Sequence, residues 1–235
     1  MPTFRYSDPI IDTFPNVFGG LLIGTVENSA SSESLQAAYR AEQQAVRERL
    51  ADTPLSEVDS LKGWREAFRT FGVDPTKYRS AAEALLRRLT KKDEIPSINT
   101  LVDAGNLVSI RYSLPVAIVD VHNLGGDVLT VHFATGQELF TPLGVETPEH
   151  PDVGEVVFTD ASGDAYARRW CWRQSARSAA RDDTTQIIGT IESHHPGGAD
   201  DVRSALRDLR ALLEQYAAFK GTDGTISKEQ TTFSG

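Results

Sequence analysis

Arginine and tryptophan alternate in residues 167–174 (ARRWCWRQ), a segment that holds two of the three tryptophans of the chain. A guanidinium group beside an aromatic ring can stack on a planar ligand and bind a carboxylate or phosphate at the same time. In an extended strand, Arg169, Cys171 and Arg173 would share one face, with Trp170 and Trp172 on the other. We therefore expect a cationic, aromatic pocket here. The alternative is an edge strand whose tryptophans fill the core and whose arginines face water.

The common catalytic motifs do not occur in this chain. There is no G-x-S-x-G, no G-x-x-x-x-G-K-[ST] and no H-E-x-x-H. Cys171 is the single cysteine, so no internal disulfide can form, and its tryptophan neighbours make it a poor candidate nucleophile. His194 and His195 lie in a predicted loop without the acidic or cysteine spacing that completes a metal site. The sequence predicts no metal and no cofactor.

Charge and hydropathy indicate a globular domain and no membrane-spanning segment. The 235 residues are 40% hydrophobic and 24% charged, as in a globular domain, and the net charge is −9. No apolar run approaches 18 residues and no signal peptide is visible at the start, so we expect a soluble cytoplasmic protein with no membrane partner. An acidic chain does not coat nucleic acid non-specifically. We expect no binding to DNA, and binding to RNA would require a local basic surface.

Residues 62–92, here called the basic region, provide such a local excess of positive charge. They hold nine Lys or Arg against three acids, which are Glu66, Asp74 and Glu83. One interpretation is an ordinary solvated helix face, and the other is an RNA-binding surface. If RNA is the ligand, the basic region and the arginines of residues 168–177 should lie on one face around a pocket mouth.

The elements that must position these residues follow from hydrophobic periodicity and capping signals. Helices are predicted over residues 33–50, 61–71, 98–112 and 199–219, with one more that begins at Asp74 and Pro75. Strands are predicted over residues 17–26, 115–122, 128–134, 154–160, 165–169 and 186–192. The turn at 123–127 should join strands 115–122 and 128–134 as a hairpin. This order predicts an α+β fold with a mixed or antiparallel sheet packed with helices.

The predicted domain spans residues 1–221. Its core covers about residues 60–195, with the N-terminal strand and helix and the C-terminal helix packed on it. Residues 222–235 are polar and are predicted to form a flexible tail. Within the helix at 98–112, Gly105 and Asn106 are poor helix formers, which indicates either close packing or a side chain with a function.

Two further segments resemble a known family. Residues 102–108 (VDAGNLV) and 114–120 (LPVAIVD) are similar to the B3/B4 domain, the editing module in the beta subunit of phenylalanyl-tRNA synthetase. The segment RRWCWRQ, followed by DTTQII, resembles free-standing versions of this domain in bacteria and archaea. The resemblance covers about residues 60–195. It implies the fold of that domain, which in synthetases removes mischarged tyrosine from the tRNA for phenylalanine.

The resemblance also implies site residues. The family's pocket asparagine falls on Asn106, while its preceding threonine falls on Gly105 and its histidine on Ala117, two departures. The late-strand glutamate, which recognises the tyrosine hydroxyl, falls on Thr190 or, with a shift of two residues, on Glu192. Catalytic residues stay unassigned. The predicted ligand-binding residues are Asn106, Arg169, Trp170, Trp172, Arg173 and Glu192.

Three functions remain open at this level. The first is a free-standing domain that hydrolyses mischarged aminoacyl-tRNA in trans, as the resemblance implies. The second is a non-catalytic module that binds RNA or a small aromatic or anionic ligand in a cationic, aromatic pocket. The third is a structural or regulatory partner of a synthetase or ribosomal factor. Whether the chain is an enzyme is left open, because deacylation can run on a positioned water without a side-chain base.

Overall fold

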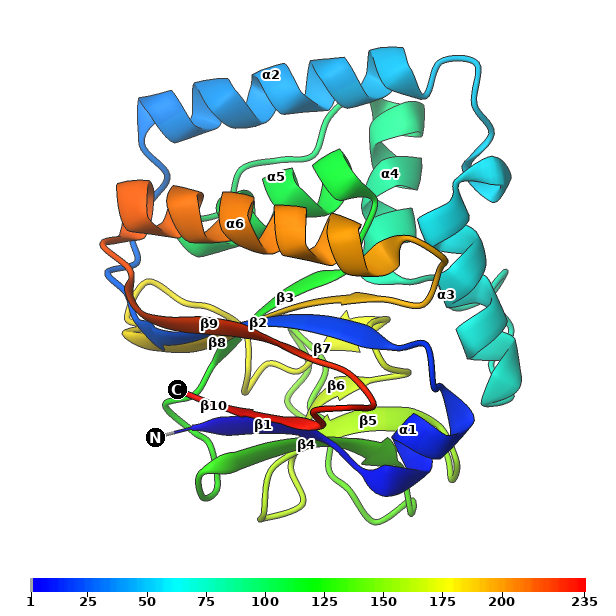
Figure 1. The fold of residues 1–235 in the computed structure, drawn as a ribbon. Coiled ribbons are helices and arrows are strands. Elements are labelled where there is room, and N and C mark those ends of the chain that lie inside the picture. Colours follow the sequence, from blue (N-terminus) through cyan, green and yellow to red (C-terminus); the bar gives the residue numbers. More distant parts are fainter. Residues whose placement is uncertain (1) are drawn as a thin grey trace.

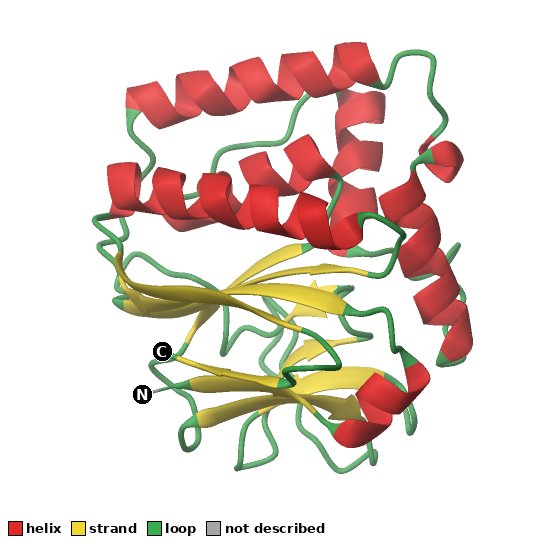
Figure 2. Cartoon of the chain, viewed as in Figure 1, coloured by secondary structure: helices red, strands yellow, loops and turns green. Residues whose placement is uncertain are grey.

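The computed structural model describes residues 2–235, which form a helical layer and two stacked sheets (Figures 1 and 2). The four-stranded sheet is antiparallel throughout, in the order β3-β8-β2-β9. The six-stranded sheet has the order β10-β1-β4-β5-β6-β7 and is mixed, because β1 and β4 are parallel. The α+β fold with mixed and antiparallel sheets, predicted from the sequence, is confirmed.

The bounds of the elements are as follows. The four-stranded sheet consists of β2 (Phe18–Thr25), β3 (Val116–Asp120), β8 (Gln186–Ser193) and β9 (Lys220–Ile226). The six-stranded sheet consists of β1 (Thr3–Tyr6), β4 (Val128–Phe133), β5 (Val156–Thr159), β6 (Ala165–Arg168), β7 (Arg173–Gln174) and β10 (Thr232–Ser234). The helices are α1 (Asp8–Thr13), α2 (Glu33–Arg49), α3 (Asp59–Thr70), α4 (Ala81–Lys92), α5 (Thr100–Tyr112) and α6 (Gly198–Ala217), with a 3₁₀ turn η1 (Leu55–Glu57).

Two hydrophobic cores lie on opposite faces of the four-stranded sheet. In β2, Leu22 packs toward α5 and α6, while Leu21 and Ile23 pack between the two sheets. This strand is buried on both faces, which is why its sequence is an apolar run and not an alternating pattern. Gly20 lets α6 approach closely, since an added Cβ would lie 2.8 Å from Val202. The helices α5 and α6 cover the sheet directly, and α2 lies over α5 (Figure 1).

The predicted hairpin of strands 115–122 and 128–134 is wrong, because β3 and β4 belong to different sheets. The Asp120 carboxylate accepts hydrogen bonds from His122 N and the Thr184 hydroxyl, which turns the chain out of the first sheet. Gly125 N then donates to Asp160 beside the second sheet. Residues 123–127 therefore connect two sheets and do not close a hairpin. Local sequence does not distinguish these two kinds of turn.

The predicted helix start at Asp74 is also wrong. The Asp74 carboxylate accepts from Thr76 N and its hydroxyl in an isolated turn. Helix α4 begins at Ala81, with Ser80 as its N-cap and Glu83 N donating to the Ser80 hydroxyl. The pattern Ser-x-x-Glu over residues 80–83 is a helix-start signature that competes with Asp-Pro, and here it prevails.

The C-terminal residues differ from the predicted flexible tail, since they complete both sheets. Strand β9 pairs with β2, and β10 pairs with β1. Gly221 permits the first pairing, because an added Cβ would lie 2.1 Å from Ile23 O. Ile226 is buried between the sheets and Phe233 packs against the same core. These two apolar side chains, spaced seven residues apart in a polar segment, were too few to signal strands in the sequence.

No helix among residues 2–235 has the length and apolar character needed to cross a membrane.

Candidate functional site

The arginine–tryptophan segment is a tight turn and not an extended strand. Arg169 and Trp170 have φ angles of 44° and 59°, in the left-handed region that non-glycine residues rarely adopt. The chain reverses there, so β6 and β7 pair as a hairpin with Arg168 opposite Arg173. The prediction that alternate residues share a face is therefore wrong. Each side chain of residues 168–173 has to be placed by its contacts.

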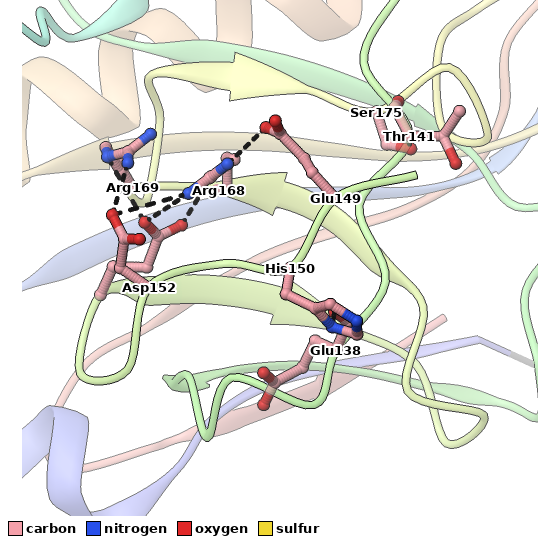
Figure 3. A network of polar contacts seen from close by, with 9 residues as sticks. Glu138, Thr141, Glu149, His150, Asp152, Arg168, Arg169 and Ser175 are labelled. Carbon is pink, nitrogen blue, oxygen red and sulfur yellow. Dashed lines mark hydrogen bonds and ion pairs between the residues drawn. The ribbon is translucent and has the colours of Figure 1, made fainter. Parts of the chain in front are cut away.

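Arg168 and Arg169 are held by acidic residues next to the turn (Figure 3). Arg168 donates to both carboxylate oxygens of Glu155 at 2.8 and 2.9 Å, and it also pairs with Glu149. Arg169 donates to Asp152 at 2.7 Å and lies 3.4 Å from Glu155. Both arginine side chains are buried, 5% and 6% exposed. Their charge is neutralised, so the predicted cationic pocket is wrong for these two residues, and Arg169 lies outside the cavity.

The cavity beside this turn, here called the inter-sheet pocket, has a volume of about 80 Å³. It opens where β3 and the end of β8 face the 170–174 turn, with Ala81 at the start of α4 on one side. Most of its wall is apolar. Its lining residues are Ala81, Pro115, Val116, Ala117, Phe158, Ala167, Trp170, Cys171, Trp172, Arg173, Gln174, Thr190 and Glu192.

Glu192 is the carboxyl group of this pocket. Its Oε1 accepts the Tyr6 hydroxyl at 2.6 Å and the Trp170 indole N–H at 3.0 Å. Its Oε2 makes no hydrogen bond within residues 2–235. Burial raises the pKa of Glu192 to about 7, against the two hydrogen bonds, which favour the charged form. The side chain can therefore accept or donate a proton near neutral pH.

The two tryptophans have different roles. Trp170 is fully buried and packs edge-on against Trp64 and Phe14, so its main contribution is to hold Glu192. Trp172 is half-buried at the pocket mouth. The Tyr78 ring packs edge-on against it, with 4.9 Å between the two ring centroids.

Arg173 is the exposed cation of the mouth. Its guanidinium lies 4.5 Å from the Trp172 ring centroid. Throughout the described chain, residues 2–235, it forms no ion pair. Arg173 is therefore the arginine of the 168–173 turn that is available to an anionic ligand group.

Asn106 lies on the other side of β3, in a second cavity here called the helix-side pocket, with a volume of about 280 Å³. Helix α5 approaches β3 closely there, since an added Cβ on Gly105 would lie 3.4 Å from Ile118. Val116 and Gln174 line both pockets. The lining residues are Ile98, Leu101, Val102, Gly105, Asn106, Val116, Ile118, Leu143, Gln174, Ala179 and Ala180.

Side-chain alternation on β3 separates the predicted site residues. Ala117 pairs with Thr190, and both line the inter-sheet pocket. Val116 and Ile118 pack against the helices, on the face of Asn106. The structure therefore brings Trp170, Trp172, Arg173 and Glu192 together and leaves Asn106 across the strand.

Part of the basic region adjoins the inter-sheet pocket. Ala81 N, at the start of α4, donates to Cys171 O at 2.8 Å and ties the helix to the turn. The buried Glu83 lies 2.8 Å from Arg65, 3.7 Å from Arg79 and 3.9 Å from Arg87. Arg65 lies on α3 and Arg79 just before α4, so these three arginines and one glutamate leave a local net charge of +2 between α3 and α4.

Several residues of the site were missed in the sequence. Tyr6 holds Glu192 across 186 positions, and no local pattern marks such a pairing. Gln174 donates to Ile118 O at 2.8 Å and separates the two pockets. Burial first and Glu192 second raise the pKa of the Cys171 thiol, which disfavours the thiolate that a nucleophilic cysteine needs.

The fold and this site define an α+β domain with a ligand-sized pocket between two sheets. The family model of the B3/4 domain matches residues 63–217, and the chain belongs to this family. The resemblance found in the sequence is thereby confirmed. Among solved structures, an N-terminal fragment of the phenylalanyl-tRNA synthetase beta subunit from Pyrococcus horikoshii is similar at 12% identity, with a TM-score of 0.45. The match covers 91% of this chain and 48% of that fragment. No curated protein matches the chain.

Proposed function

We propose that this chain hydrolyses the ester of mischarged aminoacyl-tRNA in trans, with the amino acid side chain in the inter-sheet pocket. The observation that carries the proposal is the Glu192 carboxyl, with Oε1 held by Tyr6 and Trp170 and Oε2 without a protein partner. An acceptor in an apolar cavity selects a side chain that ends in a donor. The family supports an aminoacyl group as the ligand.

The size of the pocket favours a small side chain. Its volume of about 80 Å³ is roughly half of the ~150 Å³ of a cavity that holds benzene. An aromatic ring therefore does not fit the inter-sheet pocket, which departs from the aromatic ligand considered from the sequence. We propose serine or threonine as the side chain, since each places a hydroxyl within a few atoms of the main chain.

The reaction needs no side-chain nucleophile. Water adds to the ester carbonyl carbon, and the bond from that carbon to the ribose oxygen breaks. The proton lost by the water ends on the ribose oxygen, which leaves a free amino acid and a tRNA with its terminal hydroxyl restored. Arg173, at the pocket mouth, is placed to attract the terminal phosphate of the RNA.

The test is a panel of tRNAs charged with serine, threonine, alanine, valine, tyrosine or phenylalanine. We expect release of serine and threonine, and slow release of their counterparts without a hydroxyl. The Glu192→Gln variant keeps an oxygen for Tyr6 and Trp170 but changes the free atom to a donor. A hydroxyl can also accept from the amide N–H₂ of glutamine, so the variant exchanges a hydrogen bond to a charged group for a neutral one and should lower the threonine-to-valine rate ratio by about 5-fold. An unchanged ratio would contradict the proposal.

A second function is supported by one observation. Ala117 stands on the pocket wall where the family resemblance places a histidine, and the Cys171 thiol is held neutral. The pocket therefore suits a module that binds RNA or a small ligand and carries out no chemistry. Absence of release from every substrate, in a sample with intact fold, would favour this second function.

A further inference from the structure

The outer edge of β3 carries unpaired main-chain groups between the two pockets. Glu192 N donates to Pro115 O and Val121 N donates to Gln186 O, so odd-numbered residues of this segment bond to β8. In an antiparallel pair, the intervening residues direct their N–H and C=O away from the partner. The main-chain groups of Val116 and Ile118 therefore point to the free side of β3, which is an edge strand.

The chain itself occupies most of this edge. Asp120 N donates to Ser178 O at 2.9 Å, and the Gln174 side chain donates to Ile118 O at 2.8 Å. An isolated bridge joins Val119 to Ala179. This cover ends before Val116, whose N–H and C=O have no hydrogen-bond partner within residues 2–235. Val116 also lines both pockets, so its main chain lies at their junction.

We propose that the Val116 N–H binds the carbonyl oxygen of the aminoacyl ester and stabilises the negative charge that develops there during hydrolysis. The inference rests on the proposed function and assigns the place where the ester binds. Val116 lines both pockets, so a ligand bound to its N–H lies within reach of each of them. An acyl unit bound at Val116 thus directs its side chain to the inter-sheet pocket and its ribose toward the helix-side pocket.

The helix-side pocket suits the terminal nucleoside. Its volume of about 280 Å³ exceeds the ~150 Å³ of a cavity that holds benzene, so a planar base fits. The Asn106 side chain and the free amide oxygen of Gln174 offer a donor and an acceptor to the edge of a base. Asn106 and Glu192 would then bind different parts of one ligand, although β3 separates the two side chains.

The charge balance of the step is simple. As water adds, the carbonyl π pair moves onto oxygen, and the N–H of Val116 donates to the resulting oxyanion. When the carbon–ribose oxygen bond breaks, the oxyanion returns to a carbonyl and the hydrogen bond weakens. A donor that acts on the transition state raises kcat more than it lowers KM.

Val116→Pro removes this N–H and leaves the ladder to β8 intact, because the nitrogen points away from β8 and proline is tolerated at such edge positions. We expect kcat for threonyl-tRNA to fall by about 100- to 1,000-fold, with a much smaller change in KM. The matched control is Val116→Ala, which trims the side chain and keeps the N–H, and the fall in kcat should be at least about 10-fold larger for Val116→Pro than for Val116→Ala. Equal loss in both variants would overturn the assignment.

A second measurement uses the unaltered protein and does not require turnover. The probe is 3′-amino-3′-deoxyadenosine with threonine attached through a 3′-amide, which replaces the ester and is not hydrolysed. We expect the probe to slow the hydrogen exchange of the Val116 amide, followed by NMR, by about 10-fold or more, as for a newly formed hydrogen bond of about 1.4 kcal/mol. The Ala117 amide, already bonded to β8, serves as the internal reference.

The outcomes separate the two proposals. Protection of Val116 without deacylation would support the binding site and overturn the proposed reaction. Binding of the probe with unchanged Val116 exchange, or no binding at all, would overturn the assignment of Val116. Protection by a short peptide and not by the probe would also overturn it, since the edge of β3 would then receive a protein strand.

Discussion

At the scale of single residues, the arginines of the 168–173 turn show that residue type does not decide role. Arg168 and Arg169 stabilise the turn through Glu155, and Arg173 is exposed beside Trp172. The same pattern in the sequence suggested one role for all of them. The difference arises because the pairing of β5 with β6 brings Glu155, the residue before β5, next to Arg168 and Arg169 and not next to Arg173.

Arg173→Ala should weaken binding of the aminoacyl-RNA ligand by about 1.5–3 kcal/mol, the value of a hydrogen bond to a charged group. Thermal unfolding should be unchanged, because Arg173 is exposed. The measurement is binding of the threonylated 3′-amide of adenosine monophosphate by calorimetry. Arg40→Ala, an exposed arginine on α2, is the matched control and should bind as the wild type does. Equal affinity of both variants would contradict a role for Arg173.

Glu192 should make stability depend on pH. Folding raises the pKa of its carboxyl from 4.5 to about 7, so folding favours the protonated form. The stability it contributes is fully present below about pH 4.5 and is lost as the pH rises through about 7. Relative to Glu192→Gln, the wild type should lose on the order of 3 kcal/mol of unfolding free energy between these limits. Urea titrations at several pH values measure it, and parallel profiles of the two proteins would contradict it.

At the scale of elements, α4 connects the basic region to the inter-sheet pocket. Its first residue, Ala81, bonds to Cys171 O, and its N-cap, Ser80, fixes where the helix starts. The N-terminus of α4 thus determines where one wall of the inter-sheet pocket lies.

Ser80→Ala should destabilise the protein by about 1 kcal/mol, the usual cost of losing an N-cap hydroxyl. The free energy of unfolding in urea measures this change. Asp74→Ala is the comparison, because Asp74 is the cap that the sequence suggested but it bonds only within an exposed turn. A larger loss for Asp74→Ala than for Ser80→Ala would contradict the observed helix start.

At the scale of the whole molecule, the two sheets are joined by segments from both ends of the chain. The C-terminal β9 and β10 pair with β2 and β1, one in each sheet (Figure 1). Tyr6, which holds Glu192, lies at the end of β1. The floor of the pocket therefore depends on the first and the last residues of the chain.

Removal of residues 220–235 should lower the melting temperature by at least about 4 °C, as for a loss of about 2 kcal/mol in a chain of this length. It uncovers the edges of both sheets and removes the buried Ile226. Calorimetry measures the effect. The control is Lys228→Ser with Glu229→Ser in the exposed turn between β9 and β10, which leaves both strands in place. An unchanged melting temperature for the shortened chain would support a flexible tail instead.

Local sequence is sufficient to predict where most helices and strands lie, but it does not predict which strands pair. The helices at 33–50, 61–71, 98–112 and 199–219 follow from periodicity and caps, which depend on residues a few positions apart. The partner of a strand depends on residues far away in the chain. For this reason β3 and β4 were assigned to one hairpin, and β9 and β10 were assigned to no strand at all.

The sequence by itself determined the α+β class and the B3/4 resemblance, because these depend on residue type and local order. Only the tertiary structure decided that Arg169 is neutralised, that Tyr6 holds Glu192 and that Asn106 lies across β3. Each of these depends on a contact between distant segments. The physical reason is that the charge and reach of a side chain are properties of its residue type, whereas its partners are set by how the layers pack.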